Sequence, residues 1–210
     1  MEKEKVKKII AELKKEYGNL RTALKYNTEF EILVATILSA QCTDERVNKV
    51  TEKLFKKYRT INDYANANIK EFEQEIKSTG FYRNKAKNII NSAKKIIEKF
   101  NGKVPDNMND LLQLPGVARK TANVVLNNAF NKAEGIVVDT HVRRLANRIG
   151  LSKNNNAEKI EEDLMKIINK NDWIIFSYLL IEHGRQICKA RKPDCTNCKI
   201  NNYCEKNGLK

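Results

Sequence analysis

The chain has 210 residues, with 40 Lys and Arg against 26 Asp and Glu, which gives a formal charge of +14. A chain of this length can bury a substantial core as one large domain or two small ones, and its charge favours a polyanion such as nucleic acid as the partner. The longest apolar stretch, residues 173–181, is too short to span a bilayer, and the first residues lack the apolar segment of a signal peptide.

Apolar residues recur at helical spacing along nearly the whole chain. The pattern predicts helices over residues 6–13, 32–38, 47–54, 69–77, 89–97, 118–128, 141–149, 157–168 and 172–187. Thr28 with Glu31 forms a capping-box pattern ahead of the second of these, and Asp44 is a candidate N-cap for the third. No stretch alternates with a period of two residues, so we expect an all-α fold without a sheet.

Residues 114–122, Leu-Pro-Gly-Val-Ala-Arg-Lys-Thr-Ala, combine a Pro-Gly turn with the start of an apolar helix. Unpaired backbone N–H groups at such a turn, together with the positive end of the helix dipole, form a site for one phosphate group. An ordinary turn between two helices is the alternative. Lys120 lies in the first helical turn, where the dipole disfavours a cation, and an unprotonated amine can form a Schiff base. A solvated surface lysine is the alternative here.

A single acid, Asp139, follows the apolar run Ile136-Val137-Val138 and precedes a predicted helix. Asp is a favoured N-cap residue, so its carboxylate can simply cap that helix. A carboxylate beside a cationic lysine can also stabilise positive charge that develops on a sugar. The residues alone leave both interpretations open.

Four cysteines near the C-terminus, Cys188, Cys195, Cys198 and Cys204, follow the pattern C-x6-C-x2-C-x5-C. Clustered thiols form disulfides, hold zinc or hold an iron–sulfur cluster. A single C-x2-C pair between two wider gaps suits a cluster better than the two short pairs usual in zinc modules. With a fifth cysteine elsewhere, the odd total fits a reducing cytoplasmic location better than a secreted disulfide framework.

Residues 114–122, the segment Val138-Asp139-Thr140-His141-Val142 and the four-cysteine loop together resemble the endonuclease III family of helix-hairpin-helix DNA glycosylases. The resemblance extends to residues 38–44 and 80–86 and so covers essentially the full chain. It implies an all-α fold of two helical domains with a DNA-binding cleft between them. The expected domains are residues 22–133, with six helices including the helix-hairpin-helix, and residues 1–21 plus 134–210, with the cluster loop 188–204.

The resemblance implies a bifunctional activity, which removes oxidised pyrimidines from double-stranded DNA and cleaves the strand 3′ to the abasic site by β-elimination. Lys120 matches the family's nucleophile, which forms the Schiff base. Asp139 matches the essential carboxylate, which deprotonates Lys120 or stabilises the oxocarbenium-like sugar. The clustered cysteines match the four ligands of a [4Fe–4S] cluster, and Lys189, Arg191, Lys192 and Lys199 among them would face the DNA backbone. A monomer is the family expectation.

The resemblance also implies a set of DNA contacts. Gln41 matches the residue that fills the gap left by an extruded base, and Phe81 stands where the family places an apolar wedge, often Leu. Ala118 replaces a second hairpin glycine that many members have, and it is harmless if its φ is negative. A polar loop residue, a core side chain and a helix-surface histidine are the alternatives for Gln41, Phe81 and His141. The expected set is Gln41, Phe81, Leu114, Gly116, Ala118, Arg119 and His141.

Two other functions compete with this interpretation. An adenine glycosylase of the same superfamily uses water as the nucleophile, carries Ser where Lys120 stands, and has an additional C-terminal domain, whereas this sequence continues six residues beyond Cys204. A non-catalytic DNA-binding module with zinc in the cysteine cage explains the charge, the hairpin and the cysteines. It gives no role to Lys120 or Asp139.

Overall fold

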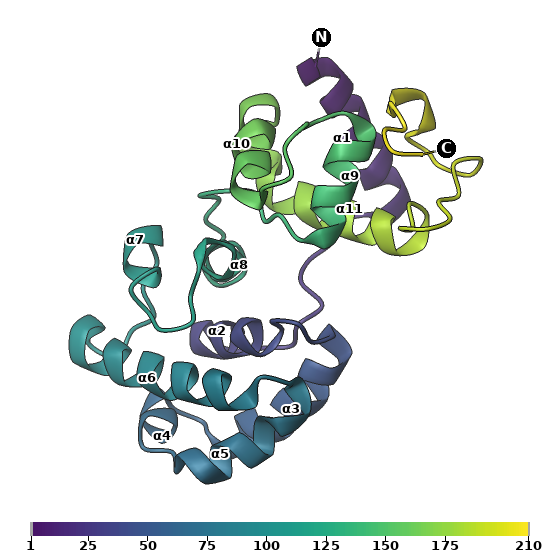
Figure 1. Ribbon diagram of the computed structural model, residues 1–210. Helices are drawn as coiled ribbons and strands as arrows, with labels where there is room; N and C mark the ends of the chain where they lie inside the picture. The colour runs from purple at the N-terminus through teal and green to yellow at the C-terminus, as the bar shows by residue number, and fades with distance from the viewer. Residues whose placement is uncertain (1, 210) are drawn as a thin grey trace. The chain divides into compact units, whose positions relative to one another are not determined.

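The structure is a computed structural model that describes residues 2–209, and its chain divides into two compact units (Figure 1). Residues Thr22–Lys132 form one, which we call the hairpin unit. Residues Met1–Arg21 and Ala133–Lys210 form the other, which we call the terminal unit. Its contacts place Ala133 in the terminal unit, one residue from the expected boundary. Residues 2–209 contain helices and turns but no strand, so the prediction of an all-α fold is confirmed.

The hairpin unit has seven α-helices, one more than the six expected. Two of them are short helices with side-chain caps of their own, from Thr60 and Asn107, and so begin independently of their neighbours. The elements are α2 (Glu29–Leu38), α3 (Asp44–Lys57), α4 (Ile61–Ala65), α5 (Ile69–Ile76), a 3₁₀ turn (Lys77–Thr79), α6 (Tyr82–Phe100), α7 (Met108–Leu111) and α8 (Arg119–Ala129).

Helix α2 lies at the centre of the hairpin unit's core. Every residue from Ile32 to Leu38 is buried, and α2 packs against α8, α6 and α3 (Figure 1). Each large apolar side chain buried in this way contributes about 1.5–3 kcal/mol. Thr28 caps α2 by accepting from the backbone N–H of Glu31, as predicted, but the Glu31 carboxylate accepts from Asn27 N–H. The cap of α3 is Thr43, so the expectation for Asp44 is wrong; Asp44 is the first helical residue.

The terminal unit contains α1 (Glu2–Tyr17), α9 (Thr140–Ile149), α10 (Ala157–Ile167) and α11 (Trp173–Gln186), with 3₁₀ turns at Lys170–Asp172 and Asn201–Tyr203. Helix α11 packs against α9 and α1 (Figure 1), and the core between them includes Leu13, Leu145 and Phe176. The cysteine-rich loop follows α11 directly. In the described part of the chain, no helix combines the length and the apolar character needed to cross a membrane.

Candidate active site, metal centre and DNA interface

The predicted hairpin is a tight turn between α7 and α8. The N–H of Val117 donates to the carbonyl of Leu114 at 3.1 Å, and Gly116, after Pro115, has a φ of +77°. Pro followed by a residue with positive φ is the pattern of a type II turn. A Cβ on Gly116 would lie 2.7 Å from Asn88 Nδ2. Glycine is therefore required here both by the backbone conformation and by the close approach of α6.

One face of α6 holds this turn in place. Ser92 Oγ donates to the carbonyl of Pro115 at 2.9 Å, and Lys95 Nζ donates to the carbonyl of Gln113 at 2.8 Å. Leu114 is buried in the core with 2% of its surface exposed. Its side chain is therefore not available to DNA, so the contact predicted at Leu114 can come only from its backbone.

The first turn of α8 begins without a side-chain cap. Its N-cap is Ala118, whose φ of −92° is one that any residue adopts, so the change from glycine introduces no strain. Gly116 and Ala118 are exposed, and Arg119 is half-exposed. An uncapped helix start behind an exposed turn is a favourable place for a phosphate, because the N–H groups and the dipole both attract an anion.

Lys120 is the second residue of α8 and is exposed. The opposite face of the helix is anchored in the core by Ala122, Val125 and Leu126, which directs Lys120 to the outside of the hairpin unit. In the protein alone the amine is therefore solvated, and any desolvation has to come from a bound substrate.

Asp139, in the terminal unit, is the N-cap of α9. Its Oδ1 accepts from the backbone N–H of Val142 at 2.8 Å, and the residue is half-buried. The capping interpretation is thus confirmed. A cap fixes the rotamer of the carboxylate and occupies Oδ1 in that bond, so capping is compatible with a chemical role for the same residue.

His141, the second residue of α9, is half-buried. Its Nδ1 lies 3.3 Å from Arg144 Nη2, and a Cβ on Gly184 of α11 would approach that Nδ1 to 2.8 Å. Burial lowers the pKa of His141, while the nearby Asp139 carboxylate acts in the opposite direction. The side chain is therefore held against α11, with part of its surface exposed.

Gln41 and Phe81 both protrude from loops with left-handed backbone. Gln41 has a φ of +54° and Phe81 a φ of +47°, and both side chains are exposed. Phe81 is 63% exposed, whereas the two other exposed large apolar residues of the described chain, Ile69 and Leu112, are 42% exposed. The core alternative for Phe81 is wrong.

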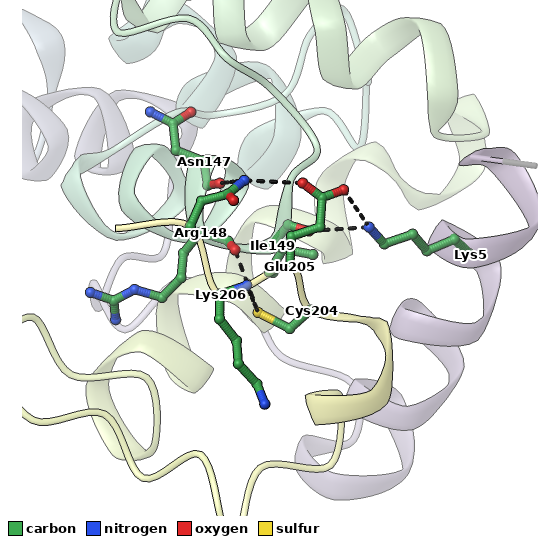
Figure 2. A network of polar contacts seen from close by, with 8 residues as sticks. Lys5, Asn147, Arg148, Ile149, Cys204, Glu205 and Lys206 are labelled. Carbon is green, nitrogen blue, oxygen red and sulfur yellow. Dashed lines mark hydrogen bonds and ion pairs between the residues drawn. The ribbon is translucent and has the colours of Figure 1, made fainter. Parts of the chain in front are cut away.

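The four clustered cysteines line one cavity in the terminal unit, together with Arg148 and His183. All five cysteines of the chain are free thiols, so the disulfide alternative is wrong. Figure 2 shows Cys204 facing the end of α9, where its thiol donates to the carbonyl of Arg148 at 3.5 Å and accepts from the N–H of Lys206 at 3.4 Å.

The residues after Cys204 are held by hydrogen bonds to α9 and α1. Lys5 Nζ donates to the carbonyl of Ile149 at 3.1 Å and to Glu205 Oε1 at 3.2 Å (Figure 2). Asn207 Nδ2 donates to the carbonyl of Asn147 at 3.2 Å. The loop is thus closed at its C-terminal end by the N-terminal helix, which explains why residues from both ends of the chain share one unit.

Two buried side chains lie within hydrogen-bonding distance of the cysteine sulfurs, and the sequence interpretation missed both contacts. Arg148 Nη1 lies 3.2 Å from Cys188 Sγ and also donates to the carbonyl of Lys189 at 3.0 Å. His183 is 2% exposed, with Nδ1 at 2.9 Å from Tyr17 Oη and Nε2 at 3.4 Å from Cys198 Sγ. Both ring nitrogens of His183 therefore have a partner.

The donor set of this cavity fits a cluster held by thiolates. Within residues 2–209, no three His, Cys, Asp or Glu side chains stand close enough to hold one metal ion. Burial raises the pKa of Cys198 to about 11 and raises that of Cys204. Thiols in such a place ionise only when a bound cation stabilises the thiolate. Hydrogen bonds to the sulfurs, as from Arg148, are what clusters of this kind receive from their surroundings.

Comparison with known proteins agrees with this geometry. Residues 34–170 match the family model of the HhH-GPD superfamily of base excision DNA repair proteins. The chain is 53% identical to an endonuclease III of Synechocystis sp. over 96% of this chain and 92% of that protein. It also resembles an endonuclease III in a non-covalent DNA complex, with a TM-score of 0.91, 43% identity and coverage of 97% and 95% of the two chains.

A second solved structure, a trapped covalent intermediate of endonuclease III with DNA, matches with the same TM-score of 0.91 and 43% identity, over 97% of this chain and 96% of that one. The family match spans more than half of the chain, and the similarity to the Synechocystis protein extends over nearly all of it. The chain therefore belongs to the endonuclease III family of the HhH-GPD superfamily.

Proposed function

We propose that Lys120 and Asp139 carry out the chemistry of this protein. Its membership of the family identifies that chemistry as the DNA glycosylase and abasic-site lyase reactions of base excision repair. The substrate in this proposal is double-stranded DNA that contains an oxidised pyrimidine or an abasic site. The observation that carries the assignment is the position of Lys120, exposed in an uncapped first helical turn directly behind a Pro-Gly hairpin.

The reaction begins with the damaged nucleotide outside the base stack, since the sugar carbon C1′ is otherwise unreachable. Lys120 Nζ attacks C1′, the N-glycosidic bond breaks, and the base leaves with the bonding electrons and takes up a proton. Opening of the sugar ring converts the C1′–N bond into a Schiff base. This cationic group withdraws electrons, so the C2′ proton is lost, a C2′=C3′ double bond forms, and the 3′ phosphate leaves. Water then hydrolyses the Schiff base and frees Lys120.

Asp139 supports the first step through its charge. Its carboxylate is held by the bond from Val142 N–H, and a preorganised anion stabilises positive charge on the sugar without rearranging during the reaction. Alternatively it accepts the proton of Lys120 before attack. In either role the cap provides the rigidity that the chemistry needs.

The DNA contacts follow from exposure. The start of α8, with Gly116, Ala118 and Arg119, receives a phosphate of the backbone. Phe81 wedges between bases while Gln41 occupies the space of the extruded base, because both project from the surface. His141 contacts the backbone from the terminal unit. Four exposed basic residues of the cysteine loop add sequence-independent affinity: Lys189, Arg191, Lys192 and Lys199.

The four cysteines would hold a [4Fe–4S] cluster, with the guanidinium of Arg148 and the ring of His183 next to the sulfurs. When bound, the cluster supplies a covalent crosslink to a loop that buries few apolar residues. Only Cys188 and Ile200 of this loop belong to the buried core. The loop thereby presents its basic residues in a fixed arrangement.

Trapping with borohydride tests the proposal. Reduction of the Schiff base during reaction with an abasic duplex should yield a covalent protein–DNA adduct, and Lys120→Gln should abolish it. Lys70→Gln is the matched control, because Lys70 is also the exposed second residue of a helix, α5. Adduct formation by Lys120→Gln would show that another group is the nucleophile. Base release by the wild type without any adduct would instead indicate a water nucleophile, as in the adenine glycosylases.

A further inference from the structure

We propose that Lys85 is a positioning residue that holds the loops of Gln41 and Phe81 at one fixed spacing, so that both side chains enter the duplex together. The inference rests on the DNA contacts of the proposed function. It concerns a residue that does not itself reach DNA, since Lys85 is only 5% exposed.

The ammonium of Lys85 links two segments that are far apart in sequence. Its Nζ donates to the carbonyl of Leu38 at 2.8 Å and to the carbonyl of Thr79 at 2.8 Å. Leu38 is the last residue of α2, three positions before Gln41, and Thr79 ends the 3₁₀ turn two positions before Phe81. One charged group therefore fixes the start of both loops.

The backbone of Lys85 holds the second loop from its other side. The N–H of Lys85 donates to the carbonyl of Phe81 at 3.1 Å, which is the first hydrogen bond of α6. The segment from Thr79 to Phe81 is thus bound at both ends by the same residue. The first loop is closed by its own turn, in which Cys42 N–H donates to the carbonyl of Ser39 at 3.1 Å.

Both loops have a backbone that needs such support. Positive φ is uncommon for residues with a side chain, and for a bulky residue such as Phe81 it is an outlier. A residue in this region is strained and persists only where the surrounding structure holds it there. Without the two carbonyl contacts, the loops would relax toward ordinary backbone conformations and the two side chains would lose their common orientation.

Electrostatics explain why a buried cation is used. The carbonyl of Leu38 lies at the negative end of α2, whose last turn contains no basic residue, so Lys85 of α6 supplies the missing positive charge. Burial lowers the pKa of Lys85, and the nearby Cys42 opposes that shift. A buried ammonium is stable only when its donors are satisfied, so the carbonyls and the cation hold one another in place.

The test compares Lys85→Met with Lys87→Met, which removes the same charge from the exposed face of α6. Affinity is measured for a duplex with a stable abasic-site analogue and for the undamaged duplex. Lys85→Met should lower the ratio of the two affinities at least about tenfold, which corresponds to about 1.4 kcal/mol. Lys87→Met should leave the ratio unchanged. An unchanged ratio in Lys85→Met would overturn the proposal.

A second measurement separates positioning from a loss of folding. Borohydride trapping on single-stranded abasic DNA requires Lys120 but no insertion into a duplex, so it should persist in Lys85→Met. Hydrogen exchange should accelerate in residues 39–42 and 79–82 and stay slow in α8. Loss of single-strand trapping, or faster exchange throughout the hairpin unit, would mean that Lys85 serves only overall stability and would overturn the proposal. Lys85→Arg, which keeps the charge and the donors, should restore part of the ratio.

The variant Gln41→Ala/Phe81→Ala distinguishes this inference from the function on which it rests. If that variant lowers the affinity ratio and Lys85→Met does not, the positioning role is wrong while the DNA contacts stand. If the double variant leaves the ratio unchanged, the DNA contacts themselves are wrong, and the role of Lys85 falls with them.

Discussion

Asp139 caps α9, and we propose that it is also the catalytic carboxylate; the two roles can be separated by substitution. Asp139→Asn keeps a side-chain oxygen that can accept from the N–H of Val142 but removes the charge. Asp139→Ala removes both. We therefore expect equal loss of turnover in the two variants but unequal loss of stability.

The magnitudes follow from the cap geometry. A side-chain cap such as the 2.8 Å bond to Val142 is worth about 0.5–2 kcal/mol. A negative charge at a helix N-terminus adds about 0.3–1 kcal/mol. Asp139→Asn should therefore lose only the charge contribution, and Asp139→Ala the sum, about 1–3 kcal/mol. For a protein of this size each kcal/mol lowers the Tm by about 2–4 °C.

Turnover should respond differently. If the carboxylate acts on the lysine or the sugar, both variants lose about 10²-fold or more of the single-turnover rate on a lesion-containing duplex. Asn156→Ala is the matched control, because Asn156 caps α10 in the same unit through the N–H groups of Glu158 and Lys159. It should lose about 1 kcal/mol of stability and keep the rate.

The assays are thermal unfolding followed by circular dichroism and single-turnover cleavage at saturating enzyme. A rate in Asp139→Asn within tenfold of wild type would refute a chemical role for the carboxylate. If the cleavage rates of all three variants fall in parallel with their Tm values, Asp139 acts only as a helix cap.

Two further predictions concern the cysteine loop. Arg148→Met removes the donor to Cys188 Sγ and leaves the carbonyl of Lys189 without that hydrogen bond. The amount of iron bound per chain and the absorbance at about 400 nm should therefore fall. Arg143→Met, on the exposed face of α9, is the control and should match wild type. Burial lowers the pKa of His183 from 6.5 to about 4, so the unfolded chain binds a proton on this ring more tightly than the folded chain does. The free energy of unfolding should therefore fall as the pH drops from 6.5 towards 4. Tm profiles of wild type and His183→Gln check this, and equal slopes would contradict it.

Local features of the sequence predicted most of the helices, the hairpin turn and a candidate metal site. The spacing of apolar residues predicted the helices of both units, except the short α4 and α7, because packing against a core requires one apolar stripe per helix. Residues 114–122 and the cysteine spacing were sufficient to indicate a hairpin and a metal site, since each depends on neighbours within a few residues. The turn chemistry of Pro115 and Gly116 is local in the same sense.

The tertiary structure decided which side chains support these features. Leu114 is buried in the core of the hairpin unit, and no local pattern distinguishes it from the exposed Leu112. Arg148 meets Cys188 across 40 residues of sequence, and Lys85 meets Leu38 across 47. A basic residue on a helix is usually solvated, and it becomes a buried donor only when another segment places sulfurs or carbonyls within hydrogen-bonding distance of it. Such pairings depend on how helices pack, and the periodicity of one helix contains no information about its partners.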